Sequence, residues 1–148
     1  MRRPVVLAMV LAVSGCADPC EPDEYEGNDA ETEVTDLGSI SDSGNHITYE
    51  LTLHSPDDAD WFTFVTVDGG IDGNPEVWIN VDGGDADIEL ELSFSCSGDP
   101  IEYFSCSGSP TDDGCVDRGK NPSLRFGYDC EGSLFDSTDN GIVILSVR

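Results

Sequence analysis

The sequence predicts an all-β fold, a single antiparallel β-sandwich of the jelly-roll type. Three observations predict it: short segments of alternating apolar and polar residues, turn-forming Gly, Asp, Ser and Asn clusters between them, and no stretch with a convincing helical stripe. Glycine and proline are frequent, at 16 and 8 residues of 148, and hydrophobic residues make up 38%. This composition favours a loop-rich β domain over a helical one.

Four strands are expected in the first half of the chain. A weak strand at 34–40 precedes a turn rich in Ser, Asp and Gly, and 47–53 alternates strictly between apolar and polar residues. An acidic turn then leads into 61–67, and a glycine-rich turn separates that strand from 77–81. Each alternating segment predicts a strand with one face in the core and one in water.

The second half begins with the clearest alternation in the chain, at 88–95. A short strand is expected at 101–104 and a long polar loop at 107–122, which Cys115 would staple. Strands at 124–128 and 141–147 complete the predicted sandwich. The last is apolar enough to be central in its sheet.

The N-terminus reads as an export signal. Two arginines precede an apolar run at 5–13, which is shorter than the about 20 residues that a spanning helix needs. The following Val-Ser-Gly-Cys resembles a bacterial lipobox, which implies cleavage before Cys16 and lipidation of that cysteine. An ordinary signal with an incidental cysteine is the alternative. We therefore expect a signal peptide at 1–15, a lipidated tether at 16–23 and one domain at 24–148.

Charge restricts the partners. The chain has 31 acidic and 6 basic residues, a net charge of −25. Such a chain repels nucleic acid and anionic lipid and favours cations. Solubility or adaptation to salt is the alternative explanation.

Cysteine usage agrees with export. Cys96, Cys106, Cys115 and Cys130 would form two disulfides in an oxidising compartment. Their spacing permits three pairings. We favour Cys96–Cys130, which would join two strand ends, and Cys106–Cys115, which would close a loop. Cys20 is then left over, and the absence of a C-x-x-C pair argues against zinc.

Two acidic segments are candidates for a calcium site. Asp57, Asp58 and Asp60 lie immediately before the strand that starts with Trp61, and three carboxylates so close repel one another unless a cation lies between them. In the leader, Glu24, Glu26 and Asn28 alternate, with Asp29 adjacent, so an extended backbone would place alternate side chains on one face. A solvated turn and a disordered tether are the alternatives.

Together, several segments resemble the bacterial pre-peptidase C-terminal domain, a β-sandwich appended to many secreted proteases. They are Glu24-x-Glu26-x-Asn28-Asp29, Asp57-x-x-Asp60-Trp61-Phe62-x-Phe64, Gly84-Asp85-Ala86-Asp87-Ile88-x-Leu90 and the closing strand 141–147. The resemblance covers roughly residues 22–148. The cysteine-rich region 96–130 departs from the family, and collagen binding, known in some members, is not implied because the exposed aromatics cannot be placed.

The resemblance implies a Ca²⁺ ion clamped between the leader and the turn before Trp61. The implied ligands are Glu24, Glu26, Asn28, Asp29, Asp57 and Asp60, with an oxygen from Thr52. Ca²⁺ takes six to eight oxygens, and backbone carbonyls or water would complete this set. Binding would order the leader.

Other candidate sites are weaker. Asp82, Asp85 and Asp87 form a second acidic turn, for which we favour a solvated turn over a cation site. Two histidines, His46 and His54, lack a nucleophile motif near them, so no catalytic triad is predicted. Glu89 and Glu91 share the exposed face of a strand, and solvent exposure is the better interpretation of that carboxylate pair than glycoside hydrolysis. In the alternation of its strand, Trp78 falls at a position that faces outward. It is either a platform on which a ligand stacks or, as we favour, a half-buried strand aromatic.

We expect a non-enzymatic, extracytoplasmic binding or adhesion module, lipid-anchored at the bacterial outer membrane or cell surface, stabilised by Ca²⁺ and monomeric. Its ligand would be a polysaccharide or a protein, recognised through an exposed patch such as Trp78 or the 107–122 loop. The alternative is a structural accessory lipoprotein that assembles with another envelope protein or a secreted hydrolase.

Overall fold

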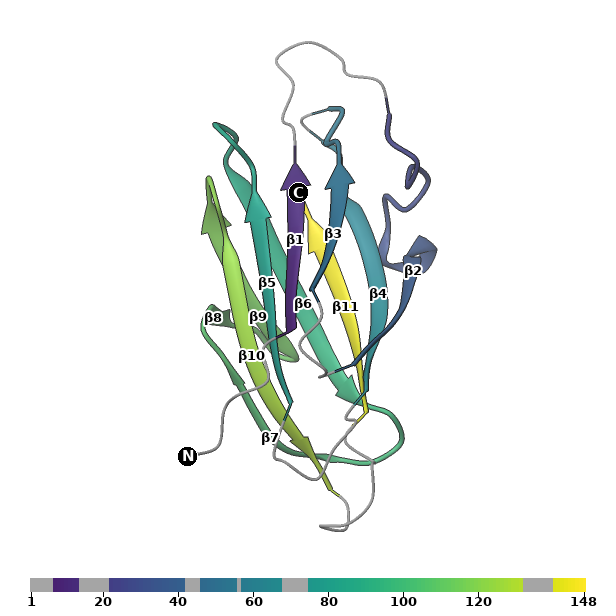
Figure 1. Ribbon diagram of the computed structural model, residues 1–148, viewed down its shortest axis with the longest axis vertical. Helices are drawn as coiled ribbons and strands as arrows, with labels where there is room; N and C mark the ends of the chain where they lie inside the picture. Colours follow the sequence, from purple (N-terminus) through teal and green to yellow (C-terminus); the bar gives the residue numbers. More distant parts are fainter. Residues whose placement is uncertain (1–6, 14–21, 42–45, 56, 68–74, 132–139) are drawn as a thin grey trace.

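The protein is built from two β-sheets packed face to face (Figure 1). The computed structural model describes residues 7–13, 22–41, 46–55, 57–67, 75–131 and 140–148. In these ranges the strands are β1 (Leu7–Val13), β2 (Thr35–Ser41), β3 (His46–Leu51), β4 (Asp60–Val67), β5 (Glu76–Asp82), β6 (Ile88–Cys96), β7 (Ile101–Cys106), β8 (Ser109–Pro110), β9 (Gly114–Gly119), β10 (Ser123–Cys130) and β11 (Gly141–Val147). A single 3₁₀ turn, η1 (Glu31–Glu33), is the helical structure in these ranges, and within them no helix is long and apolar enough to cross a membrane.

The strand order is β3-β1-β5-β10-β7 in one sheet and β2-β4-β11-β6-β9-β8 in the other. Most neighbours are antiparallel, while β1 runs parallel to both β3 and β5, and β2 runs parallel to β4. The predicted all-β sandwich is therefore confirmed.

The strand β11 lies in the middle of the six-stranded sheet, as its apolar sequence predicts. All seven of its residues pair with β4 on one side and with β6 on the other. At one end Val147 pairs with Asp60, and at the other end Gly141 pairs with Thr66. This register defines the two ends of the sandwich to which the sites below are referred.

The core forms where the alternating strands turn their apolar faces inward. Burial along β4 alternates residue by residue, so that Phe62 and Phe64 are fully buried. Towards the Gly141 end the core becomes aromatic, with the ring centroids of Phe94 and Tyr128 4.3 Å apart. The buried Tyr128 hydroxyl donates a hydrogen bond to Thr66 Oγ1 at 2.7 Å, which satisfies the polar end of this side chain.

Two disulfides tie the C-terminal third together, in the pairing that the sequence analysis favours. Cys96 is bonded to Cys130 and Cys106 to Cys115, with Cα–Cα separations of 5.9 and 6.3 Å. The first links the ends of β6 and β10, which belong to different sheets. Cys20 lies outside the described residues.

The expectation of a long polar loop at 107–122 is wrong. The strands β8 and β9 occupy half of this segment, and β9 adds to the sheet beside β6. Only Gly114, Cys115 and Val116 of β9 are buried. The strand therefore lacks the alternation of apolar and polar residues by which a strand is predicted from sequence. Gly114 is required there, because a Cβ atom would lie 1.8 Å from the Leu92 carbonyl oxygen.

The apolar run expected to be a signal peptide forms β1. It lies between β3 and β5, and Leu11 is fully buried in the core. This is the arrangement of the chain before any processing. Cleavage before Cys16, a residue outside the described ranges, remains a prediction.

Replacing Leu11 tests the position of β1 in the unprocessed chain. Leu11→Ala should lower the free energy of unfolding by about 2–5 kcal/mol, because it empties a buried leucine site. Urea unfolding of the oxidised full chain measures the change. Ile142→Ala, at a strand residue that is 38% exposed, is the control and should cost much less. Equal effects of the two substitutions would show that β1 does not pack in the core.

Candidate metal centre

The acidic leader folds against the start of β4. The Trp61 N–H donates to the Asn28 carbonyl oxygen at 3.0 Å, and Asn28 Nδ2 donates to the Trp61 carbonyl oxygen at 3.1 Å. Tyr25 packs edge-on against Tyr49 and Phe62, with centroids 6.1 and 5.9 Å apart. Apolar packing and paired hydrogen bonds thus hold the leader on the sandwich, and Asn28 is only 1% exposed.

Asp23 makes a second connection between the leader and the sandwich. Its Oδ2 accepts a hydrogen bond from the Thr52 N–H at 2.6 Å, and its Oδ1 accepts one from the Tyr25 N–H at 2.8 Å. The carboxylate therefore joins the leader to the segment that follows β3. Thr52, expected to supply an oxygen ligand, takes part here through its backbone N–H.

Asp60 is the most unusual group of this region. It is 1% exposed, and neither carboxylate oxygen has a hydrogen-bond partner among the described residues. Burial, with the charges of Asp58, Asp23 and other nearby acids, raises the pKa of Asp60 to about 7. The Asn28 side-chain oxygen is also buried without a donor. An unpaired buried carboxylate is costly, so a proton or a cation would stabilise these oxygens.

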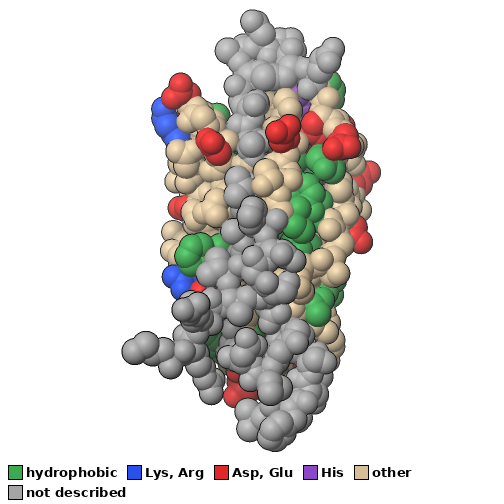
Figure 2. Space-filling model, in the orientation of Figure 1, with side chains coloured by type: hydrophobic (Ala, Val, Ile, Leu, Met, Phe, Trp, Pro, Cys, Tyr) green, Lys and Arg blue, Asp and Glu red, His purple; other side chains and the backbone are tan. Residues whose placement is uncertain are grey.

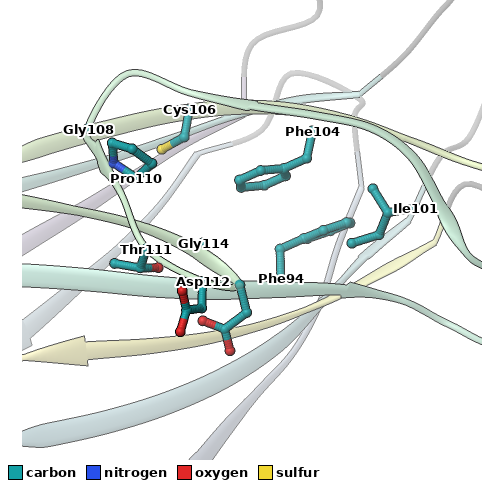
Figure 3. A pocket seen from close by; sticks show the side chains of 10 residues that line it. Phe94, Ile101, Phe104, Cys106, Gly108, Pro110, Thr111, Asp112 and Gly114 are labelled. Atoms are coloured by element: carbon teal, nitrogen blue, oxygen red, sulfur yellow. The ribbon is translucent and has the colours of Figure 1, made fainter.

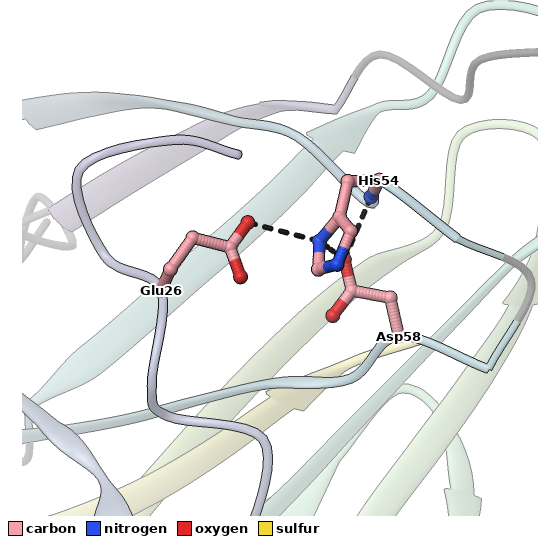
Figure 4. Close-up of side chains that lie close together, drawn as sticks. All are labelled: Glu26, His54 and Asp58. Carbon is pink, nitrogen blue, oxygen red and sulfur yellow. Dashed lines mark hydrogen bonds and ion pairs between the residues drawn. The ribbon is translucent and has the colours of Figure 1, made fainter. Parts of the chain in front are cut away.

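Beside this carboxylate lies a cluster formed by Glu26, His54 and Asp58 (Figure 4). His54 Nδ1 is 2.9 Å from Glu26 Oε1 and 2.8 Å from Asp58 Oδ2. These are ion-pair distances without hydrogen-bond geometry, whereas the His54 backbone N–H makes a hydrogen bond to Asp58 Oδ2 at 2.7 Å. The ligand atoms of the three side chains lie within 4.8 Å of one another.

The electrostatics of the cluster favour positive charge. Partial burial lowers the pKa of His54, but the negative charges of Asp58 and Glu26 outweigh it and raise that pKa above its ordinary value. Acidic side chains also gather towards the upper end of the face shown in Figure 2. The excess negative charge therefore favours a proton on His54, and it would also favour a metal ion among the carboxylates. The donors of this region are mainly oxygens, which suits a hard cation such as Ca²⁺.

Of the ligands expected from sequence, the structure brings Glu26, Asn28 and Asp60 into one region. Asp29 is exposed but close enough to raise the pKa of Asp60. Glu24 is exposed and helps to raise the pKa of Tyr25, after burial of that ring. Asp57 is exposed in the turn, with its neighbour Asp58 facing inward instead.

Three residues of this region are absent from the expected ligand set: His54 and Asp58 of the cluster, and Asp23 beside it. His54 and Asp58 are four residues apart around a turn, and the turn geometry decides which carboxylate points inward. The sequence contains one usable signal, because an acidic residue four positions from a histidine at a strand end permits this contact. Asp23 has no such signal, since its partner Thr52 is distant in the chain.

The other candidate sites look structural. Asp82, Asp85 and Asp87 are all exposed, and Asp85 forms an ion pair with Lys120 at 3.3 Å, which agrees with a solvated turn. Trp78 is half-buried with the Arg125 guanidinium 4.8 Å from its ring centroid. Trp78 is therefore a half-buried strand aromatic and does not form an exposed platform for ligand stacking.

The shifted pKa values predict how stability depends on pH in the metal-free protein. Asp60 and His54 both bind protons more tightly in the folded chain, so the stability they contribute is lost as pH rises through their folded pKa values. For Asp60 the window runs from 3.8 to about 7.

We expect urea unfolding in excess EGTA to show lower stability at pH 8 than at pH 5, by on the order of 2–4 kcal/mol from Asp60. Asp60→Asn should remove most of this difference, since the amide does not titrate. A wild-type protein that gains stability over this interval, with the variant unchanged, would contradict the assignment.

Comparison of the sequence with known families and curated proteins adds no relative. No known protein-family profile matches the chain, and no curated protein matches it. The resemblance to the pre-peptidase C-terminal domain therefore depends on the residues of this chain: the acidic leader, the turn before Trp61 and the strands that follow.

Proposed function

We propose that this chain is a non-catalytic binding module of the bacterial cell envelope, anchored by lipid on Cys16 and stabilised by Ca²⁺. The observation that supports it best is the buried carboxylate of Asp60, which has no partner at the junction between the leader and β4. A divalent cation at this junction would join two segments that are more than thirty positions apart, as the Asn28–Trp61 hydrogen bond already does.

The residues of the junction fit a calcium ion. Asp60 offers two oxygens and Asn28 one. Glu26 and Asp58 belong to a neighbouring set of ligand atoms, shared with His54, and their charges reach Asp60 and raise its pKa. Backbone carbonyls or water would complete the six to eight oxygens that Ca²⁺ takes. The ion would supply positive charge among mutually repelling carboxylates, so its binding energy would add to the stability of the docked leader.

Burial of the junction favours a stabilising role for the ion over a reactive one. Asp60, Asn28 and Asp58 are 1%, 1% and 8% exposed, so a substrate has little access to them. The leader that closes the junction also leads towards the proposed anchor. Calcium would thus fix how the domain stands on the membrane.

Processing before Cys16 would remove β1 from its sheet. The strands β3 and β5 both run parallel to β1 and hence to each other. They can pair directly once they approach by one inter-strand spacing, about 4.8 Å. The six-stranded sheet, the leader contacts and both disulfides involve no residue of β1. The proposal is therefore compatible with a processed chain that keeps its sandwich.

Calcium binding is tested by thermal unfolding with and without the ion. In EGTA, Asp60→Asn should melt above the wild type, because it removes an unpaired buried charge. Ca²⁺ should raise the wild-type melting temperature and leave the variant unchanged. This reversal of order is specific to a carboxylate that a cation neutralises.

Asp99→Asn is the matched control, because Asp99 is exposed in the turn between β6 and β7. It should respond to Ca²⁺ like the wild type. A calcium response that survives in Asp60→Asn would locate the ion elsewhere, and the lack of any response in the wild type would exclude a stabilising calcium site.

Lipid anchoring is tested by Cys16→Ser in a bacterial host fed a clickable palmitate analogue. The wild type should incorporate label and remain with the membranes until detergent is added. The variant should incorporate no label, because the thioether site is absent. Cys20→Ser is the control and should be labelled normally. Label that persists in Cys16→Ser would contradict the proposed anchor.

A further inference from the structure

A pocket of about 520 Å³ opens between the edge of the β7 strand and the β8–β9 hairpin, far from the proposed calcium site (Figure 3). The sheet register separates the two: Phe94 of the pocket pairs with Val143, near the Gly141 end of β11, while Asp60 pairs with Val147 at the other end. The volume lies within the roughly 300–1,000 Å³ of typical small-molecule sites.

The walls of the pocket are mainly apolar and aromatic. Phe94 and Phe104 stack with ring centroids 5.5 Å apart and an angle of 15° between their planes. Ile101, 44% exposed, borders them, and Pro110 lies opposite. These surfaces would bury an apolar body of about the size of a substituted benzene ring.

Polar groups occur on one side only, at the turn between β8 and β9. The Asp112 and Asp113 side chains are exposed among the lining residues, so they place negative charge at the rim. The Thr111 Oγ1 atom is buried and has no hydrogen-bond partner among the described residues. Thus two carboxylates make this side of the rim acidic, while the rest of the lining is mainly apolar.

The polar turn is held rigidly in place. Thr111 N–H donates to the Gly114 carbonyl oxygen and Phe94 N–H to the Asp113 carbonyl oxygen, both at 3.0 Å. The Cys106–Cys115 disulfide ties β7 to β9 across the hairpin. A Cβ atom on Gly108 would lie 2.6 Å from Leu124 Cδ2, so the chain passes too close there for any side chain. The pocket is therefore preformed, which lowers the entropic cost of binding.

We propose that this pocket binds a small organic cation with an apolar, preferably aromatic, body and an ammonium group. The ring would lie against Phe104 and Phe94, and the ammonium would face the carboxylates of Asp112 and Asp113. Aromatic faces also attract ammonium groups, and the net charge of −25 disfavours anionic ligands. This deepens the proposed binding function by giving it a ligand class and a location.

The test compares three ligands of the same shape on the oxidised full chain, by NMR chemical-shift titration in 150 mM NaCl. They are 2-phenylethylammonium, 2-phenylethanol and 3-phenylpropanoate. The ammonium should bind more tightly than the alcohol by about two- to five-fold, the range for an exposed charge pair, and the carboxylate should bind most weakly. Shifts should centre on Phe94, Phe104 and Thr111. Equal affinity for all three, or shifts elsewhere, would overturn the proposal.

Variants separate the two walls. Asp112→Asn with Asp113→Asn should lower ammonium affinity to that of the alcohol and leave the alcohol unchanged. Asp85→Asn with Asp87→Asn makes the same charge change in another turn and should leave the preference intact. If both pairs act alike, the selectivity comes from net charge and the site is wrong.

Phe104→Ala should weaken every ligand by about five-fold or more, because it removes one wall. Tyr103→Ala, at the adjacent residue that is 51% exposed, is its control and should have little effect. If Phe104→Ala does not fold, Ile101→Ala, at a lining residue that is 44% exposed, replaces it and should weaken all three ligands, because it removes apolar contact with the ring. No loss of affinity in the folded variant would overturn the proposed location of the ring.

Titrations in EGTA and in Ca²⁺ distinguish this proposal from the calcium site. If the amine binds but calcium does not shift the melting temperature, the pocket proposal is supported and the calcium site is contradicted. If calcium raises the melting temperature but the amine is not preferred over the alcohol, the calcium site is supported and the pocket proposal is contradicted.

Discussion

The structure depends on how the acidic leader meets the first residues of β4. Asn28 and Trp61 exchange two hydrogen bonds, and this contact buries the carboxylate of Asp60 next to other acids. Such an arrangement is unfavourable by itself, because a buried negative charge loses its water and repels its neighbours. The junction is therefore the place where the folding of this strongly acidic chain is coupled to protonation of Asp60, and where the proposed cation would act.

The two ends of the sandwich are stabilised by different interactions. At the Asp60 end, hydrogen bonds, aromatic packing and a His54–Glu26 ion pair hold the leader, and the raised pKa values of Asp60 and His54 make this end sensitive to pH. At the Gly141 end, aromatic packing and two disulfides fix the hairpins without charge. Because apolar packing and covalent bonds are indifferent to calcium, the second end can present a rigid pocket whatever the state of the first.

Much of the fold could be predicted from sequence, because in a strand with one buried face the apolar residues recur at every second position. The alternation at 88–95 and the apolar 141–147 predict β6 and β11 and their burial. The β8–β9 hairpin escaped prediction, since its burial is confined to three residues, one of them a glycine. The sequence allowed three disulfide pairings and favoured one of them, because the spacing of cysteines does not show which strand ends lie close together.

For the site, the sequence by itself determined the chemistry: acidic residues in excess, a leader with alternating oxygens and a turn of aspartates before an aromatic strand. Only the tertiary structure decided which of them converge. It turned Asp58 inward and left Asp57 in solvent, brought Asp23 to Thr52, and placed His54 between two carboxylates. The physical reason is that convergence depends on turn geometry and on contacts between residues distant in the chain, neither of which a local pattern encodes.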